Sequence, residues 1–231
     1  MAENLHSGHR QRVRKEFLEH GIDENTPAHK VFELLLFYSI PRCDTNEIAH
    51  RLLERFGSIS AVLDAPIEEL MEVKGISESS ALLLKLVIPI ARVYKCEKQK
   101  IPVKFNSLDE IGDFLLERYF GYTQEVFSLV CLDGNGRFLS CEIIEKGDIA
   151  SVGVSARKII QAISKTNARC VALAHNHPGG VAVPSAADIS VTQMIAEAVS
   201  HIDVKLLDHF IIANEDYVSM AQSAKYREIF K

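Results

Sequence analysis

The sequence predicts an α+β protein. An all-helical N-terminal domain, residues 1–99, precedes an α/β domain, residues 100–231, with a mixed sheet flanked by helices. Apolar residues recur at three- and four-residue intervals through the first part of the chain, as they do in amphipathic helices. Beyond it, short β-branched and aromatic runs alternate with helical patterns, which is typical of a sheet covered by helices.

The helical pattern covers residues 9–97 almost without interruption. Short breaks that hold turn and capping residues divide this region into five or six helices. The breaks are Thr26-Pro27, Cys43-Asp44-Thr45, Gly57-Ser58, Ala65-Pro66 and Gly75-Ile76-Ser77.

The domain boundary is expected within residues 95–104, where the residue before Pro102 is pushed out of the helical region. Beyond it the pattern predicts elements in a fixed order. They are a helix over 107–119, a β-hairpin of strands 125–132 and 138–144, a helix over 153–166, a buried strand over 169–174, a helix over 185–200 and a strand over 204–213.

Composition indicates a folded protein of 231 residues, long enough for two cores. Hydrophobic residues make up 47% and charged residues 25%, which excludes a disordered chain or a fibre. The N-terminus has no apolar h-region, and the apolar stretch 81–91 contains Lys85 and Pro89, so we expect neither a signal peptide nor a membrane span. Five scattered cysteines without a C-x-x-C pair predict no disulfide framework and fit a reducing cytoplasm.

One short segment carries the most informative pattern. Residues i and i+2 of a strand point to the same side, so His175 and His177 would present two imidazole rings together at a strand end. Pro178 ends strand pairing, and the glycines after it let the chain turn back. Ser185 occupies an N-cap position, which puts Asp188 in the first turn of the next helix. Two imidazoles, one carboxylate and an open fourth position describe a catalytic zinc site.

Each piece of this pattern also has an ordinary explanation. Ser-x-x-Asp before an apolar helix is a capping box, and a lone His-x-His pair occurs at strand ends or in loops as satisfied histidines. The combination favours a metal site, because a buried apolar strand does not end in two polar rings without a reason.

The spacing His175-x-His177, seven residues, Ser185, two residues, Asp188 matches the JAMM (MPN) metalloprotease motif. The His-Asn-His-Pro context resembles the bacterial RadC family, and the resemblance spans nearly the whole chain. It implies a cytidine-deaminase-like JAMM/MPN domain with peptidase or isopeptidase chemistry. It also implies one zinc ion per chain, held by the two histidines and the aspartate.

The same resemblance implies roles for further residues. Glu125 corresponds to the general base, which takes a proton from zinc-activated water and hands it to the leaving amine. Ser185 would donate a hydrogen bond toward the developing oxyanion. Gly179 departs from the serine that is usual in the family, which bears on the loop that faces the substrate. Asp208 and His209 also match the family, and their role stays open between a structural contact and support of the metal ligands.

Residues 67–81 resemble a helix-hairpin-helix element, in which backbone donors at the start of the second helix hold a DNA phosphate. The resemblance implies candidate DNA contacts at Lys74, Gly75 and Ser77. However, Ser77 replaces the second glycine of the motif and Glu78 adds negative charge, so a plain helical hairpin explains the pattern equally well. The net charge of −5 also argues against non-specific coating of nucleic acid.

The leading interpretation is therefore a zinc-dependent hydrolase of the RadC (DNA repair protein-like) family, with a peptide or protein substrate of unknown identity. The alternative is a DNA-repair-associated DNA-binding module whose metal domain is structural or inactive. Zinc deaminase chemistry is disfavoured, because the P-C-x-x-C ligand pair that it needs is missing.

Overall fold

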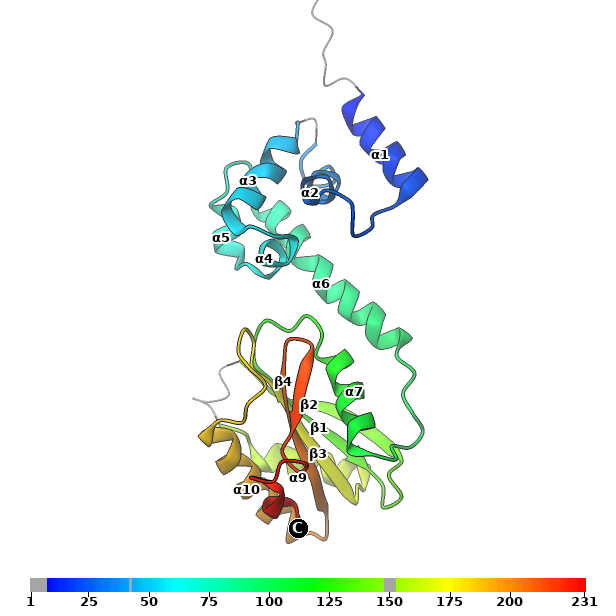
Figure 1. Ribbon diagram of the computed structural model, residues 1–231, viewed down its shortest axis with the longest axis vertical. Helices are drawn as coiled ribbons and strands as arrows, with labels where there is room; N and C mark the ends of the chain where they lie inside the picture. The colour runs from blue at the N-terminus through cyan, green and yellow to red at the C-terminus, as the bar shows by residue number, and fades with distance from the viewer. Residues whose placement is uncertain (1–7, 42, 148–152) are drawn as a thin grey trace, which may run out of the picture. The chain divides into compact units, whose positions relative to one another are not determined.

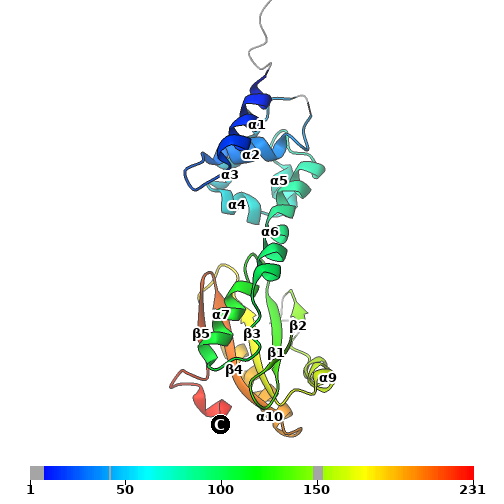
Figure 2. The ribbon, with the colours of Figure 1, turned by 90° about the vertical axis from the view of Figure 1, so that its right-hand side faces the viewer.

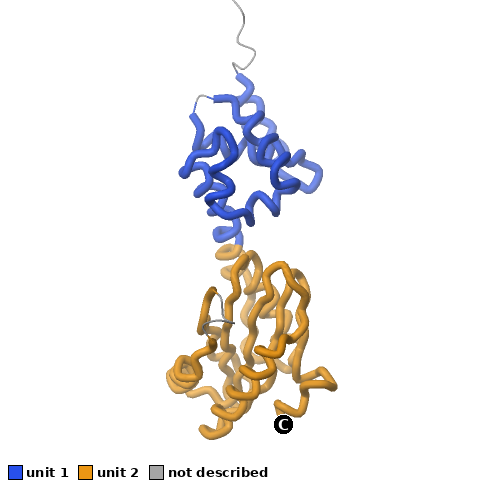
Figure 3. Tube along the Cα trace, turned by 90° about the vertical axis from the view of Figure 1, so that its left-hand side faces the viewer, with its two compact units in different colours: residues 1–91 blue, residues 92–231 orange. Residues whose placement is uncertain are grey.

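The computed structural model describes residues 8–41, 43–147 and 153–231 (Figure 1). The chain divides into two compact units, residues 1–91 and 92–231 (Figure 3). Residues 1–7, 42 and 148–152, which the two predicted domains include, lie outside the described residues. Within the described part of the chain, none of the helices combines the length and the apolar character that crossing a bilayer requires.

The described residues of the first unit form helices, as predicted, and all five predicted breaks separate them. The helices are α1 (His9–His20), α2 (Ala28–Leu36), α3 (Asn46–Phe56), α4 (Ile59–Asp64), α5 (Ile67–Met71) and the first part of α6 (Glu78–Lys98). Phe32, Leu52, Leu70 and Leu84 are each 0% exposed and lie in one shared core. The amphipathic pattern therefore buries one face of each helix in that core.

The turn between α5 and α6 depends on Gly75. Its φ angle is +102°, and a Cβ atom there would lie 2.8 Å from Cδ1 of Ile48 on α3. The Gly75→Ala variant combines a left-handed backbone with a steric clash, so we expect it to lose about 2–4 kcal/mol of unfolding free energy.

The matched control is Gly57→Ala, where φ is +87° and no described atom lies within 4 Å of an added Cβ. This variant has the strain of the left-handed backbone but no clash, so it should lose about 1–2 kcal/mol of unfolding free energy. Denaturant unfolding measures both losses, and equal values would contradict the close approach of Gly75 to Ile48.

The second unit contains a five-stranded sheet in the order β2-β1-β3-β4-β5. The strands are β1 (Val126–Leu132), β2 (Phe138–Lys146), β3 (Cys170–Asn176), β4 (Lys205–Ala213) and β5 (Asp216–Ser219). β3 pairs in parallel with β4, whereas the other neighbouring pairs are antiparallel, so the sheet is mixed, as predicted. The antiparallel pairing of β1 with β2 confirms the predicted hairpin.

Helices cover both faces of this sheet (Figure 2). α7 (Leu108–Arg118) packs on one face, and α9 (Ala156–Thr166) and α10 (Ala186–Ser200) pack on the other. Because side chains alternate along a strand, Val130 of β1 contacts the α7 side and its neighbour Leu129 contacts the α9 and α10 side. The predicted α/β arrangement is confirmed.

Two short elements are not predicted by the sequence pattern: β5 and a 3₁₀ helix, η1 (Arg227–Phe230). β5 has only four residues and forms because its backbone pairs with the end of β4, from Phe210 opposite Ser219 to Ala213 opposite Asp216. A four-residue strand is too short for its alternation to stand out from the neighbouring turns.

The division between the units falls between Ala91 and Arg92, inside α6, rather than after residue 99. Arg92 shows why, because its Nη1 donates to the Gly121 carbonyl at 3.3 Å and its guanidinium lies 4.1 Å from the centre of the Tyr122 ring. The last turns of α6 therefore belong to the second unit. The extended residues around Pro102 end the helix but do not separate the two cores.

Candidate metal centre

β3 ends in polar residues that alternate between the two sides of the sheet. His175 is buried, at 4% exposure, and His177 follows on the same side, directly after the strand. The His177 N–H still donates to the Ile212 carbonyl of β4 at 2.8 Å. Between them, Asn176 accepts the Val126 N–H through Oδ1 at 2.7 Å and so closes the end of β1. Both histidine backbones are thus held by neighbouring strands.

The predicted capping box at the start of α10 is present. Ser185 Oγ accepts the Asp188 N–H at 3.2 Å, and the Ser185 N–H donates to Asp188 Oδ2 at 2.6 Å. The same carboxylate faces the histidines, with Oδ1 3.1 Å from His175 Nε2 and Oδ2 3.4 Å from His177 Nε2. The capping residue and the candidate ligand are therefore one side chain.

The spacing of these three groups fits a zinc ion. Their ligand atoms all lie within 4.8 Å of one another, and the two Nε2 atoms are 2.8 Å apart. Tetrahedral zinc with bonds of about 2.0–2.2 Å places neighbouring ligand atoms about 3.3 Å apart. His175 Nε2 lies 2.8 Å from His177 Nε2 and 3.1 Å from Asp188 Oδ1, and both separations are close to that value. Small side-chain adjustments would bring all three atoms within bonding distance of one ion.

Electrostatics favours the ionised form of Asp188. Burial raises the pKa of this carboxyl group, but hydrogen bonds with His175 and Ser185 and the charge of His175 together outweigh burial. They hold the pKa of Asp188 well below its ordinary range. The carboxylate is therefore ionised at neutral pH, as a metal ligand must be.

The hydrogen bonds of the two imidazoles also fix their tautomers. His177 Nδ1 lies 3.2 Å from the Val181 carbonyl oxygen, which can only accept, so Nδ1 carries the proton. His175 Nδ1 lies 3.0 Å from Nε2 of His209. His209 Nδ1 contacts Thr192 Oγ1 at 2.7 Å, and this hydroxyl donates onward to the backbone carbonyl of Asp188 at 2.5 Å.

The direction of this chain follows from its last acceptor. Because the Thr192 hydroxyl gives its proton to a carbonyl, it accepts from Nδ1–H of His209, whose Nε2 then accepts from Nδ1–H of His175. Burial and the nearby His175 hold the pKa of His209 well below its ordinary value, so its ring is neutral. Both candidate ligands, His175 and His177, therefore carry a proton on Nδ1 and turn Nε2, the nitrogen that a metal ion would bind, toward Asp188.

This arrangement predicts an effect of His209 on zinc affinity. His209→Leu removes the acceptor for His175 Nδ1–H and should weaken zinc binding about 10–100-fold. His209→Gln can still accept that proton through its side-chain carbonyl and should lose less. Competition with a chromophoric chelator measures both affinities, and wild-type affinity in His209→Leu would contradict a supporting role.

Glu125 and Ser185 lie in the same cavity as the candidate ligands. The cavity has a volume of about 120 Å³, and Glu125 directly precedes β1 at its edge. Its lining consists of Glu125, Phe127, Gly153, Val154, His175, His177, Ser185, Ala187, Asp188 and Val191. The Ser185 hydroxyl oxygen accepts in the helix cap, so its own proton stays available to donate.

The loop after His177 explains the departure at Gly179. Its φ angle is +68°, a left-handed conformation that a serine adopts at a cost. The Gly180 N–H then donates to the His177 carbonyl at 3.1 Å, which closes a turn beside the candidate ligand. This tight turn therefore favours glycine at position 179.

The candidate DNA contacts lie in the predicted helical hairpin of α5 and α6. Lys74 and Ser77 are exposed, and the Lys74 carbonyl accepts a hydrogen bond from Arg51 at 3.2 Å. Ser77 directly precedes α6, and its carbonyl accepts the Ala81 N–H at 2.9 Å. The hairpin geometry matches the sequence interpretation, and the DNA contact itself stays a prediction.

Sequence reasoning left the role of His209 open and missed Thr192 and Asn176. One signal was available for His209, because it is a histidine within a mostly apolar strand. In the sheet, Leu173 lies opposite His209, so alternation puts His209 on the same side as His175. Nothing in the sequence indicates Thr192, because its contact depends on how α10 packs on β4.

One family model and several known proteins are similar to this chain. A family model described as a RadC-like JAB domain matches residues 105–226. A UPF0758 protein of Pseudoalteromonas translucida is 32% identical over 92% of this chain and 94% of its own length. A UPF0758 protein of Fusobacterium nucleatum is 32% identical over 96% of this chain and 98% of its own length. A third, from Ectopseudomonas mendocina, is 31% identical over 92% of this chain and 94% of its own length.

Proposed function

The chain belongs to the RadC family, and we propose that its second unit is a zinc-dependent hydrolase of the JAMM type that cleaves peptide or isopeptide bonds. One observation carries the proposal: His175, His177 and Asp188 converge, and both imidazoles present Nε2 to the carboxylate. Three protein ligands leave the fourth position of a tetrahedral ion open, which is typical of catalytic zinc.

A zinc ion held by these residues would supply Lewis acidity, lowering the pKa of water and polarising a carbonyl group. We assign to Glu125 the general base, which takes the proton from the attacking water and later delivers it to the leaving amine. Ser185 donates its hydroxyl proton to the substrate oxygen as negative charge develops there. Apolar neighbours such as Phe127 and Val191 lower the local dielectric, which strengthens both interactions.

The direct test is hydrolysis of defined amides by the full chain loaded with one equivalent of zinc. The substrates pair linear peptides with peptides branched through a lysine side chain, and mass spectrometry detects the new termini. We expect cleavage of at least one class, loss of cleavage with a chelator and recovery when zinc is restored. Cleavage that persists after chelation, or no cleavage of either class of peptide, would contradict the proposal.

DNA binding by the first unit is the alternative function, and the tight hairpin at Gly75 supports it. In this case the second unit would be structural or inactive. Contacts to phosphates would give a steep dependence of affinity on salt for branched or linear duplex DNA, and Lys74→Gln should reduce the slope by about 1. No binding at low salt ends this alternative.

A further inference from the structure

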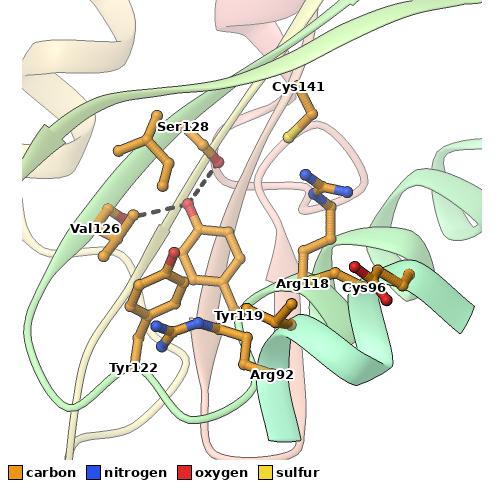
Figure 4. Close-up of a pocket in the computed structure, with 11 residues that line it drawn as sticks. Arg92, Cys96, Arg118, Tyr119, Tyr122, Val126, Ser128 and Cys141 are labelled. Atoms are coloured by element: carbon orange, nitrogen blue, oxygen red, sulfur yellow. Dashed lines mark hydrogen bonds between the residues drawn. The ribbon is translucent and has the colours of Figure 1, made fainter. Parts of the chain in front are cut away.

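A second cavity in the second unit lies on the opposite side of β1 from the candidate metal centre. It has a volume of about 530 Å³ and a wall built from α6, α7, β1 and β2 (Figure 4). Val126 and Ser128 of β1 line this cavity, whereas Phe127 lines the cavity with the metal ligands. The alternation of side chains along β1 therefore separates the two sites.

Two arginines face this second cavity. Arg92 of α6 stacks on Tyr122 at 4.1 Å, measured from its guanidinium carbon to the ring centre. Arg118, from the end of α7, lies near the thiol of Cys141 (Figure 4), and its guanidinium carbon is 5.2 Å from the centre of the Phe114 ring. In the described part of the chain, no carboxylate forms an ion pair with either guanidinium. A guanidinium has five N–H donors, so both groups keep donors for a ligand.

The other lining residues indicate which kind of ligand would fit this cavity. Glu97 is the single acidic side chain among the described residues of the wall. Because two arginines also line the wall, its net charge is positive. Val93 and Ile143 add apolar surface. Figure 4 shows the guanidinium groups of Arg92 and Arg118 on either side of the Tyr119 ring, so two acidic groups joined by an apolar body would match them.

We propose that this cavity binds a small organic dianion whose two carboxylate or phosphate groups meet Arg92 and Arg118. Arginine pairs with planar or tetrahedral oxyanions through two parallel hydrogen bonds, which fits both kinds of acidic group. The volume of about 530 Å³ is that of an ordinary small-molecule site, which usually combines apolar walls with a few placed polar groups. This site is independent of the proposed hydrolase activity.

The rate at which Cys96 is alkylated can report on ligand binding, because Cys96 lines this cavity and is half-buried. The full chain is treated with N-ethylmaleimide, and mass spectrometry follows alkylation of each cysteine at increasing probe concentration. Exposed Cys43 of the first unit is the internal control. Two probes carry two acidic groups: 1,4-phenylenediacetate and its phosphate-bearing analogue 4-(carboxymethyl)phenyl phosphate. Two further probes serve as controls: the monoanion 4-methylphenylacetate and the neutral diamide of 1,4-phenylenediacetate.

We expect one or both dianions to slow alkylation of Cys96 but not of Cys43, with weaker protection by the monoanion and none by the diamide. Stronger protection by the dicarboxylate identifies carboxylate as the preferred group, whereas stronger protection by the phosphate probe identifies phosphate together with its additional negative charge. Arg92→Gln and Arg118→Gln should each weaken protection about tenfold or more, because each removes a charged hydrogen-bond donor. Arg157→Gln, which changes an exposed arginine of α9, should leave protection unchanged.

The comparison of dianion with diamide uses the unchanged chain, so it decides the proposal even if an arginine variant fails to fold. No protection of Cys96 by either dianion, or equal protection by the neutral diamide, would overturn it. The experiment is run on zinc-loaded and on chelator-treated protein. Equal protection in both preparations is expected, and protection found only with zinc would overturn the separation from the metal centre.

Discussion

The zinc-loaded Glu125→Gln variant is expected to cleave a substrate of the unchanged chain about 10²–10⁴ times more slowly. Glutamine keeps the size of the side chain but cannot take a proton from water. Glu125 is not a member of the candidate ligand group, so zinc content should not change. The rate and the bound zinc are measured on the same preparation.

Glu117→Gln is the matched control, because Glu117 is an exposed carboxylate of α7 outside the candidate metal cavity. It should cleave at the wild-type rate. Full activity in Glu125→Gln would show that another group takes the proton, whereas loss of zinc together with activity would make Glu125 a metal ligand.

Asp188→Asn should weaken zinc binding more than about 100-fold, beyond the effect of changing a group that only supports a ligand. The neutral amide loses the charge that zinc requires of this ligand. Its side-chain oxygen can still accept the Ser185 N–H, so the helix cap is largely kept. Competition with a chromophoric chelator measures the affinity.

The same variant separates the two roles of Asp188. In the presence of a chelator, its unfolding free energy should lie within about 1 kcal/mol of that of the unchanged chain, the value of a typical cap. Asp188→Ala should lose both zinc and the cap. If Asp188→Asn keeps the wild-type zinc affinity, Asp188 is not a zinc ligand and serves only to cap α10.

The helices of the first unit could be predicted because their limits are local. Ser58, for instance, accepts the Ala61 N–H at the start of α4, and Gly57 with a φ of +87° ends α3. Such caps need only neighbouring residues. The end of the first unit could not be predicted, because α6 continues across it and only the contacts of Arg92 show that its last turns join the second unit.

The candidate ligands could be predicted because one strand, one turn and one helix start bring them together within a short segment. Glu125 needed a family resemblance, since it reaches the site through the antiparallel pairing that sets Phe127 opposite His175. His209 and Thr192 depend on how β4 and α10 pack. The cavity between Arg92 and Arg118 depends on tertiary contacts alone, and no sequence spacing indicates it.

The zinc content of the purified full chain tests the central claim most directly. Elemental analysis should find close to one zinc ion per chain after metal-free dialysis, and the ion should be lost in His177→Ala. The control His201→Ala, at the exposed end of α10, should keep it. A chain that takes up no zinc when the metal is supplied, or a His177→Ala variant that holds as much as the unchanged chain, would contradict the metal centre.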